Sequence, residues 1–246
     1  MTEIADAATL VGCDLAGRPS SWAVKADQLV DLPSSALVTQ RVRLADGTTL
    51  VRRSLRDGAS DPAFWSLDNE IRALARLTRA FPDEERSPFP VLVGYDVDGL
   101  DPWALVSDYR GRPAREAVSG LLSSGQLDVV TGLFDALARM ALVEVAHHAL
   151  GLGSIYLAGT TLSIVSFEHA AFFGEPPTGR SGAAAGPADD LPDAGRLLYE
   201  VFTGEPARVE RPDLSAVPLI NARVADLFAE PHERPSAAEV LRRFAG

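Results

Sequence analysis

The residues best able to do chemistry in this chain of 246 residues are two adjacent histidines and a few charged side chains. His147 and His148 stand side by side, and the remaining histidines are His169 and His232. Imidazoles bind metals and act as general bases, but these positions lack the HExxH spacing that puts two ligands on one helix face. The sequence therefore favours a structural role for His147, as a prop for the loop that carries it, over a metal site.

Two further patterns could indicate phosphate binding or phosphorylation. Gly151-Leu152-Gly153 has the small residues of a phosphate loop, but it follows a helical segment and not a strand, which is typical of a plain turn. Segment 171–189 is rich in Gly, Pro, Ala and Ser and is predicted to be a loop, with Thr178 and Ser181 as candidate phosphorylation acceptors. Neither pattern by itself predicts an active site.

Composition excludes several classes of protein. With 34 acidic and 23 basic side chains, the net charge is -11, which disfavours nucleic acid and anionic membranes as partners. No run of about 18 uncharged apolar residues is present, and the N-terminus carries acids where a signal peptide carries bases. Cys13 is the single cysteine, so an internal disulfide or a zinc site built from cysteines is ruled out. We expect a cytoplasmic protein without membrane insertion.

The first half of the chain has mostly strand patterns. Residues 1–22 show no periodicity, which predicts an irregular arm. Alternation on both sides of Asp46-Gly47 predicts a hairpin, because glycine accepts the positive φ of the turn. The predicted elements are strands 37–44 and 48–55, an amphipathic helix over 61–78, and strands 89–97 and 103–107.

The second half has mostly helical patterns. The predicted elements are a helix over 127–146, a small hairpin of strands 154–157 and 161–167, helices over 193–203 and 217–228, and a last helix that a capping box opens at Ser236 and Glu239. A β-rich part with one helix followed by an α-rich part predicts an α+β fold, with a hinge near 108–113.

Four segments resemble, in order and spacing, parts of eukaryotic-type protein kinases. DNEIRALARL (68–77) resembles the C-helix, and WALVSDYRGRP (103–113) resembles the strand that leads into the hinge. DDLPDAGRLLYEVFTGEPA (189–207) is similar to the F-helix, and PHERPSAAEVLRRF (231–244) to the approach to the last helix. The resemblance runs from about residue 23 to the end of the sequence.

This resemblance implies one kinase-like domain with two lobes. A small β-rich N-lobe with one helix would span 23–110, after an N-terminal arm over 1–22, and a larger α-helical C-lobe would span 111–246. Glu70 would take the ion-pairing Glu position of the C-helix, Asp190 the Asp position of the F-helix, and Arg234 the Arg position before the last helix.

Kinases transfer phosphoryl groups with a Lys on the phosphates, an Asp at the acceptor hydroxyl, and an Asn and an Asp on Mg²⁺. The resemblance places Arg53 where the Lys stands. Strand alternation puts Arg53 on the same face as Val51 and Leu55, so it is expected to point into the implied cleft. A guanidinium can pair with Glu70, but its fork geometry differs from that of an ammonium, so such a pair would be structural.

The other catalytic positions are also replaced. The resemblance puts Ala149 at the acceptor-orienting Asp and Ser154 at the metal-binding Asn, and the D-F-G triplet falls on Ser166-Phe167-Glu168. Residues 32–36 stand where a glycine-rich loop is expected, and no A-P-E motif is present. Each lost group in a preorganised site costs roughly 10²–10³ in rate. Mg²⁺-dependent phosphoryl transfer is therefore expected to be absent.

The resemblance and these losses together imply a catalytically inactive pseudokinase without a cofactor. It would act as a scaffold or allosteric regulator by protein–protein interaction in a bacterial-type signalling system. Phe64, Trp65 and Phe81 either pack the implied C-helix or form an exposed docking face, because the outer C-helix surface of kinases is a regular partner site.

Two alternatives stay open. One is an atypical phosphotransferase of the kinase fold that uses Arg53, Glu70 and Glu168, with Glu168 as either a substitute metal carboxylate or a solvated loop acid. The other is a sensor that binds ATP without metal. Its nucleotide pocket would lie around Ser107, Asp108 and Arg110, with Arg53 as the charge-balancing cation.

Overall fold

The computed structural model describes residues 8–30, 32, 35–56, 61–83, 87–176 and 184–244, with the backbone alone for Asp61 and Ala216. The candidate acceptors Thr178 and Ser181 lie outside the described residues. The chain divides into two compact units. The first consists of Met1–Tyr109 and Ser166–Glu168, and the second of Arg110–Val165 and His169–Gly246.

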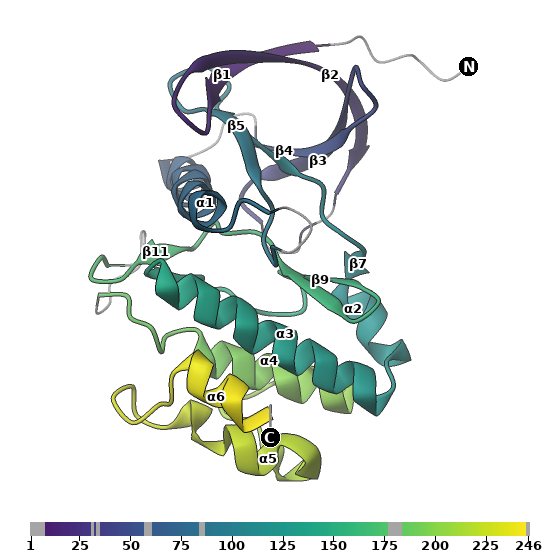
Figure 1. The fold of residues 1–246 in the computed structure, drawn as a ribbon, viewed down its shortest axis with the longest axis vertical. Coiled ribbons are helices and arrows are strands. Elements are labelled where there is room, and N and C mark those ends of the chain that lie inside the picture. Colours follow the sequence, from purple (N-terminus) through teal and green to yellow (C-terminus); the bar gives the residue numbers. More distant parts are fainter. Residues whose placement is uncertain are drawn as a thin grey trace. The chain divides into compact units, whose positions relative to one another are not determined.

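The first unit is built on a closed six-stranded antiparallel β-barrel (Figure 1). Its strands follow the order β1-β2-β3-β4-β6-β5, and β1 pairs with β5 to close the ring at Cys13↔Tyr95 and Asp14↔Gly94. The strands are β1 (Ala8–Asp14), β2 (Pro19–Leu29), β3 (Val38–Leu44), β4 (Thr49–Ser54), β5 (Leu92–Asp96) and β6 (Trp103–Ser107).

The closed barrel overturns two predictions. A kinase-like N-lobe has an open sheet, so the resemblance to the protein kinase family and the two-lobed kinase-like fold are both wrong. The cause lies in the predicted irregular arm over 1–22, because residues 8–14 and 19–22 of that stretch form β1 and the start of β2. Leu10 is the one buried hydrophobic residue of β1, so this strand shows almost no apolar alternation in the sequence. The mixed α+β content is present as predicted.

Two glycines make closure of the barrel sterically allowed. A Cβ atom at Gly12 would stand 2.3 Å from the carbonyl oxygen of Tyr95, and one at Gly94 would stand 2.3 Å from the Trp22 ring. Only a residue without a Cβ lets the seam strands approach this closely. The Trp22 ring meets Trp103 edge-on, with centroids 5.6 Å apart, and the buried core around it comprises Leu10, Val24, Val42, Leu50, Trp103 and Leu105.

Helix α1 (Asp61–Ala80) lies beside β5 in the first unit (Figure 1). It confirms the helix predicted over 61–78, and the predicted stripe of Leu67, Ile71, Leu74 and Leu77 is buried. The predicted hairpin is also confirmed, since β3 and β4 pair from Val38↔Ser54 to Arg43↔Thr49 and Gly47 has φ 88°.

The second unit is mostly helical, with two small sheets. The sheets have the strand orders β10-β9-β7 and β11-β8, and α3 contacts both α4 and α6. The elements are β7 (Arg112–Pro113), α2 (Ala114–Ala117), η1 (Val118–Gly120), α3 (Ser123–Leu142), β8 (Val145–Ala146), β9 (Ile155–Ala158), β10 (Thr161–Ile164), β11 (Ala171–Phe172), α4 (Leu191–Thr203), η2 (Leu214–Ala216), α5 (Pro218–Val224), η3 (Ala225–Phe228) and α6 (Ala237–Phe244).

Two predicted helices differ in extent from those of the structure. The helix predicted over 127–146 ends at Leu142, because Glu144 takes a left-handed φ of 58° and β8 then pairs with β11. The helix predicted over 217–228 is split into α5 and η3. The predicted capping box is confirmed: Ser236 N–H donates to Glu239 Oε2 at 2.6 Å, and Glu239 N–H donates to Ser236 Oγ at 3.2 Å. Among the described residues, no helix is both long and apolar enough to cross a membrane.

The Gly94→Ala variant tests the seam of the barrel. Its methyl group would overlap the Trp22 ring, so we expect the free energy of unfolding to fall by about 1–3 kcal/mol in urea denaturation. Gly120→Ala is the matched control, since a Cβ there meets no atom within 4 Å. Adding Trp22→Leu to Gly94→Ala should recover part of the lost free energy of unfolding, because the smaller side chain leaves room for the methyl group. If the losses of the two single variants simply add in the double variant, the proposed steric cause is wrong.

Candidate functional site

The most concentrated group of charged side chains in the first unit is buried. Arg53 of β4, Glu70 of α1 and Glu168 have exposed fractions of 0%, 1% and 1%. Arg53 Nη2 donates to Glu168 Oε1 and lies 3.5 Å from Glu70 Oε2, while Nη1 donates to Thr39 Oγ1 at 2.8 Å. One guanidinium thus serves two carboxylates. We call Arg53, Glu70 and Glu168 the buried charge cluster.

Glu168 is held by further donors. Ala36 N–H donates to its Oε2 at 2.8 Å, and the hydroxyls of Ser35 and Ser166 donate to its Oε1. Asn69, one residue before Glu70 on α1, donates from its Nδ2 to the main-chain carbonyl oxygen of Glu168 at 3.0 Å. Of the two readings of Glu168, the solvated loop acid does not fit this position. Residues 35 and 36, which stand where the resemblance implies a glycine-rich loop, instead donate hydrogen bonds to a carboxylate.

The pKa values follow from burial and pairing. Burial raises the pKa of Glu70 to about 7, since the nearby Arg53 charge offsets it only in part and the Glu168 charge adds to it. Burial also acts to raise the pKa of Glu168, but the Arg53 charge and the hydrogen bonds from Ser35, Ala36 and Ser166 outweigh it, so the net shift is downward. Arg53 and Glu168 therefore form the ionised pair at neutral pH, and Glu70 is close to half protonated.

This arrangement favours a structural role for the buried charge cluster. Two carboxylates and a guanidinium could in principle neutralise a phosphate or relay a proton. Here every one of them is withdrawn from solvent, and Arg53 is already bonded to Glu168 and Thr39. The sequence signalled Arg53 and Glu70, whereas the contributions of Thr39, Ser35 and Asn69 had no local signal.

Two of the residues proposed to line a nucleotide pocket have side chains that hydrogen-bond within the first unit. The Ser107 hydroxyl is buried and accepts the Val91 N–H at 2.9 Å. Asp108 Oδ1 accepts Arg41 Nε at 2.8 Å. Arg110 belongs to the second unit.

His147 anchors a loop in the second unit. Its ring is buried, with Nε2 at 3.1 Å from the carbonyl oxygen of Val165, and burial lowers its pKa to about 4, so it is neutral. The N–H groups of His147 and His148 donate to the two carboxylate oxygens of Asp190, each at 2.7 Å. Asp190 thereby holds His148 in a left-handed conformation with φ 59°.

Ala149 and Ser154 form a turn within this loop. Ser154 Oγ accepts the Gly151 N–H at 3.1 Å and lies 3.2 Å from the carbonyl oxygen of Ala149. The turn predicted from Gly151 and Gly153 is confirmed, since Ser154 N–H also donates to Gly151 O at 3.0 Å. Within the described ranges, no three His, Cys, Asp or Glu side chains are grouped so that they could hold a metal ion.

Comparison with known proteins assigns no family to the chain. No protein-family model matches it, and a search of curated proteins finds no match.

The Glu70→Gln variant tests the protonation of the cluster. Because the folded pKa of Glu70 is about 7 against 4.5 for a free side chain, the folded state binds more protons between these values. The contribution of Glu70 to the free energy of unfolding should then fall by about 3 kcal/mol as pH rises through this window and stay level above it. His147 opposes this fall, because its pKa of about 4 lies below the free value, so its contribution rises with pH up to that free value. Glu168 also acts in the opposite sense to Glu70, since its lowered pKa removes stability only as pH falls below its free value.

Glu70→Gln should remove the Glu70 contribution, so its free energy of unfolding, measured in denaturant, should rise by about 3 kcal/mol relative to the unaltered chain between about pH 5 and about pH 8. Asp68→Asn, two residues earlier on α1 and 42% exposed, should leave the Glu70 contribution intact. An unchanged pH profile in Glu70→Gln would contradict the assignment.

The Arg53→Met variant tests the pairing. It leaves two buried carboxylates without a counterion, so we expect a loss of about 3–5 kcal/mol in the free energy of unfolding. The control is Arg43→Met, which removes the exposed Arg43–Asp27 pair at 3.2 Å on the same barrel and should cost about 1 kcal/mol or less. Adding Glu168→Gln to Arg53→Met removes one of the unpaired charges and should restore part of the stability. This double variant provides the test if Arg53→Met alone does not fold. Equal losses for Arg53→Met and Arg43→Met would exclude a buried pair.

Proposed function

We propose that this protein acts by binding another protein through an apolar surface of its first unit. The observation that carries the proposal is the exposure of large apolar side chains around one hollow. Phe64 and Trp65 of α1 are 47% and 54% exposed, and Val97, after β5, is 43% exposed. The hollow, which we call the α1 groove, has a volume of about 200 Å³ and is lined by Phe64, Trp65, Leu67, Asp68, Val97 and Pro102.

The exposure of these side chains is costly unless a partner covers them. Leu74 and Leu77 of the buried stripe of α1 pack in the first unit, whereas about half of the Phe64 and Trp65 side chains is exposed. Leu100, in the same β5–β6 connection as Val97, is 109% exposed. Contiguous apolar surface of this kind marks interaction sites, and tryptophan is among the residues that dominate binding energy at interfaces.

The charges around the α1 groove indicate the chemistry of the partner. Asp96, Asp98 and Asp101 surround Leu100 in the sequence, and Asp68 lines the groove itself. Arg52 pairs with Asp101 in part, but the whole chain carries -11. A segment with apolar anchors flanked by Lys or Arg matches this surface, because Asp68 and the acids near Leu100 in the sequence attract a basic partner and disfavour an acidic one.

We still propose a scaffold or regulator role, but it now depends on the α1 groove and no longer on a kinase fold. Enzymatic use of Arg53, Glu70 and Glu168 gains no support, since these groups are buried and bonded to one another. We include a cytoplasmic location in the proposal, supported by the acidic composition and the single cysteine.

The test uses a synthetic amphipathic peptide with Leu and Phe along one face and Lys at both ends. Titration into the full chain, followed by tryptophan fluorescence, should show saturable binding that weakens at high salt. Trp65→Ala should weaken binding by about tenfold or more in a calorimetric titration. Leu142→Ala, which alters a 77% exposed side chain of α3, should leave affinity unchanged.

A second peptide with Glu at both ends separates the two parts of the proposal. If it binds as well as the Lys peptide, the basic partner is wrong but the apolar surface stands. If neither peptide binds, or if Trp65→Ala binds the Lys peptide as tightly as the unaltered chain, the α1 groove is not the binding surface.

A further inference from the structure

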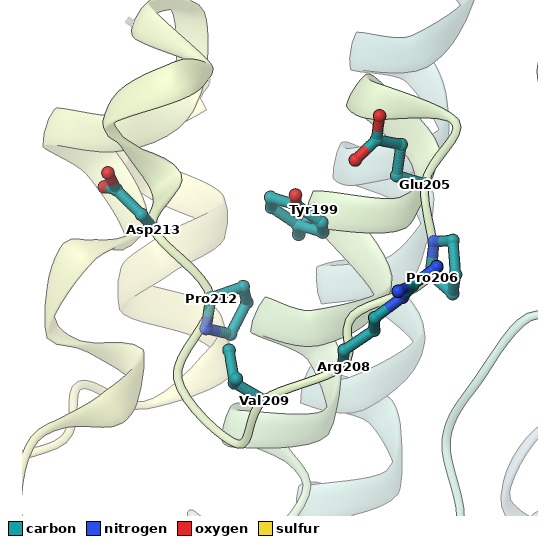
Figure 2. Close-up of a pocket in the computed structure, with 7 residues that line it drawn as sticks. All are labelled: Tyr199, Glu205, Pro206, Arg208, Val209, Pro212 and Asp213. Carbon is teal, nitrogen blue, oxygen red and sulfur yellow. The ribbon is translucent and has the colours of Figure 1, made fainter.

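The second unit contains a larger hollow at the end of α4, with a volume of about 700 Å³. Its lining, which we call the Tyr199 pocket, consists of Tyr199, Glu205, Pro206, Arg208, Val209, Pro212 and Asp213 (Figure 2). The volume falls within the range of about 300–1,000 Å³ that is typical of ligand sites. Figure 2 shows Tyr199 between Asp213 on one side and Glu205 on the other.

The loop that encloses the Tyr199 pocket is tethered at both ends. After α4 ends at Gly204, Glu205 N–H donates to Thr203 Oγ1 at 3.1 Å and Ala207 N–H donates to Glu200 Oε1 at 3.0 Å. At the far end Asp213 Oδ1 accepts the Ser215 N–H at 2.9 Å. Pro206 and Pro212 remove backbone freedom between these tethers. A loop held in this way forms its pocket before any ligand arrives, which lowers the entropic cost of binding.

The lining combines an apolar floor with charged groups. Pro212 is buried, and Val209 is 58% exposed within the pocket. Of the charged groups, Glu205 and Arg208 make no side-chain hydrogen bond or ion pair with any other residue that the structure describes. The hydrogen bonds from Ser215 hold the pKa of Asp213 below its usual value, so this carboxylate is ionised at neutral pH.

The balance of these groups favours a cation. Two carboxylates oppose one guanidinium in the lining, and the face of an aromatic ring attracts ammonium and guanidinium groups. Aliphatic and proline side chains beside the ring suit the apolar body of such a ligand. We propose that the Tyr199 pocket binds an amine or guanidinium group carried on an apolar body, between Glu205 and Asp213 and against Tyr199.

Such a group has two sources, a free polyamine or the Arg or Lys side chain of a peptide. Three probes distinguish them: spermidine, the capped peptide acetyl-Leu-Arg-Leu-amide, and the same peptide with neutral citrulline in place of Arg. Each is titrated into the full isotope-labelled chain, and backbone amide shifts report where it binds. We expect shifts at 205–213, with the citrulline peptide bound about tenfold or more weakly than the Arg peptide. Saturation by spermidine alone identifies a small free cation, and saturation by the Arg peptide alone identifies a peptide side chain.

Variants assign the charge preference to the pocket. Glu205→Gln and Asp213→Asn should each weaken cation binding about threefold to tenfold, and Asn can still accept the Ser215 N–H. Arg208→Gln removes a repelling charge and should strengthen it, an effect that a merely structural role would not produce. Tyr199→Phe keeps the ring and should bind normally, whereas Tyr199→Leu should not. Asp128→Asn, an exposed acid of α3, is the control for net charge.

The proposal is overturned if no probe shifts the backbone amides of residues 205–213 at about 10 mM, because a Kd above this concentration is too weak for specific recognition. Equal binding of the citrulline and Arg peptides would also overturn it, because the charge would then play no part. Because the proposed protein partner binds the first unit, failure here leaves the α1 groove untouched.

Discussion

One buried guanidinium shared by two buried carboxylates is the interaction on which the first unit depends. Burying ions is costly, and the cost is repaid only when each charge has a partner and hydrogen bonds satisfy the remaining atoms. Arg53 meets this condition in part: Glu168 and Thr39 accept from its two Nη atoms, whereas its buried Nε makes no hydrogen bond within the described residues. Glu70 meets it in part by taking up a proton near neutral pH. The cluster therefore tolerates two acids beside one base because the second acid need not be charged.

The same interaction determines which parts of the chain belong together. Arg53 comes from a barrel strand, Glu70 from α1, and Glu168 from a segment about a hundred residues later in the sequence that nevertheless belongs to the first unit. Asn69 and Ala36 reinforce the connection by bonding to the main chain and side chain of Glu168. A buried charge network of this kind specifies one arrangement of its elements, since any other would leave an ion unpaired.

Arg53, Glu70 and Glu168 of the first unit are buried against one another, and the functions that we propose depend on two surfaces instead. The α1 groove offers exposed aromatic side chains with acids nearby, and the Tyr199 pocket offers a tyrosine between two carboxylates. Both are features of an acidic protein whose contacts combine apolar area with negative charge. Basic, partly apolar ligands fit each of them for the same electrostatic reason.

The sequence by itself determined the elements whose signals are local. Helix α1 follows from the spacing of Leu67, Ile71 and Leu74, the β3–β4 hairpin from alternation around Gly47, and the start of α6 from the Ser236–Glu239 box. Each depends on residues within a few positions of one another, which is the range over which periodicity and capping act.

Only the tertiary structure decided the closure of the barrel and the partner of Arg53. Closure depends on Gly12, where a Cβ atom would overlap the carbonyl oxygen of Tyr95 across the β1–β5 seam, and on Gly94, which packs against the Trp22 ring. It also depends on two strands with few buried apolar residues. The Arg53–Glu168 pair joins positions 115 residues apart. No local pattern encodes either contact, because pairing across the seam and charge balance in the interior are properties of distant residues brought together. For that reason four kinase-like segments pointed to an open sheet that the chain does not form.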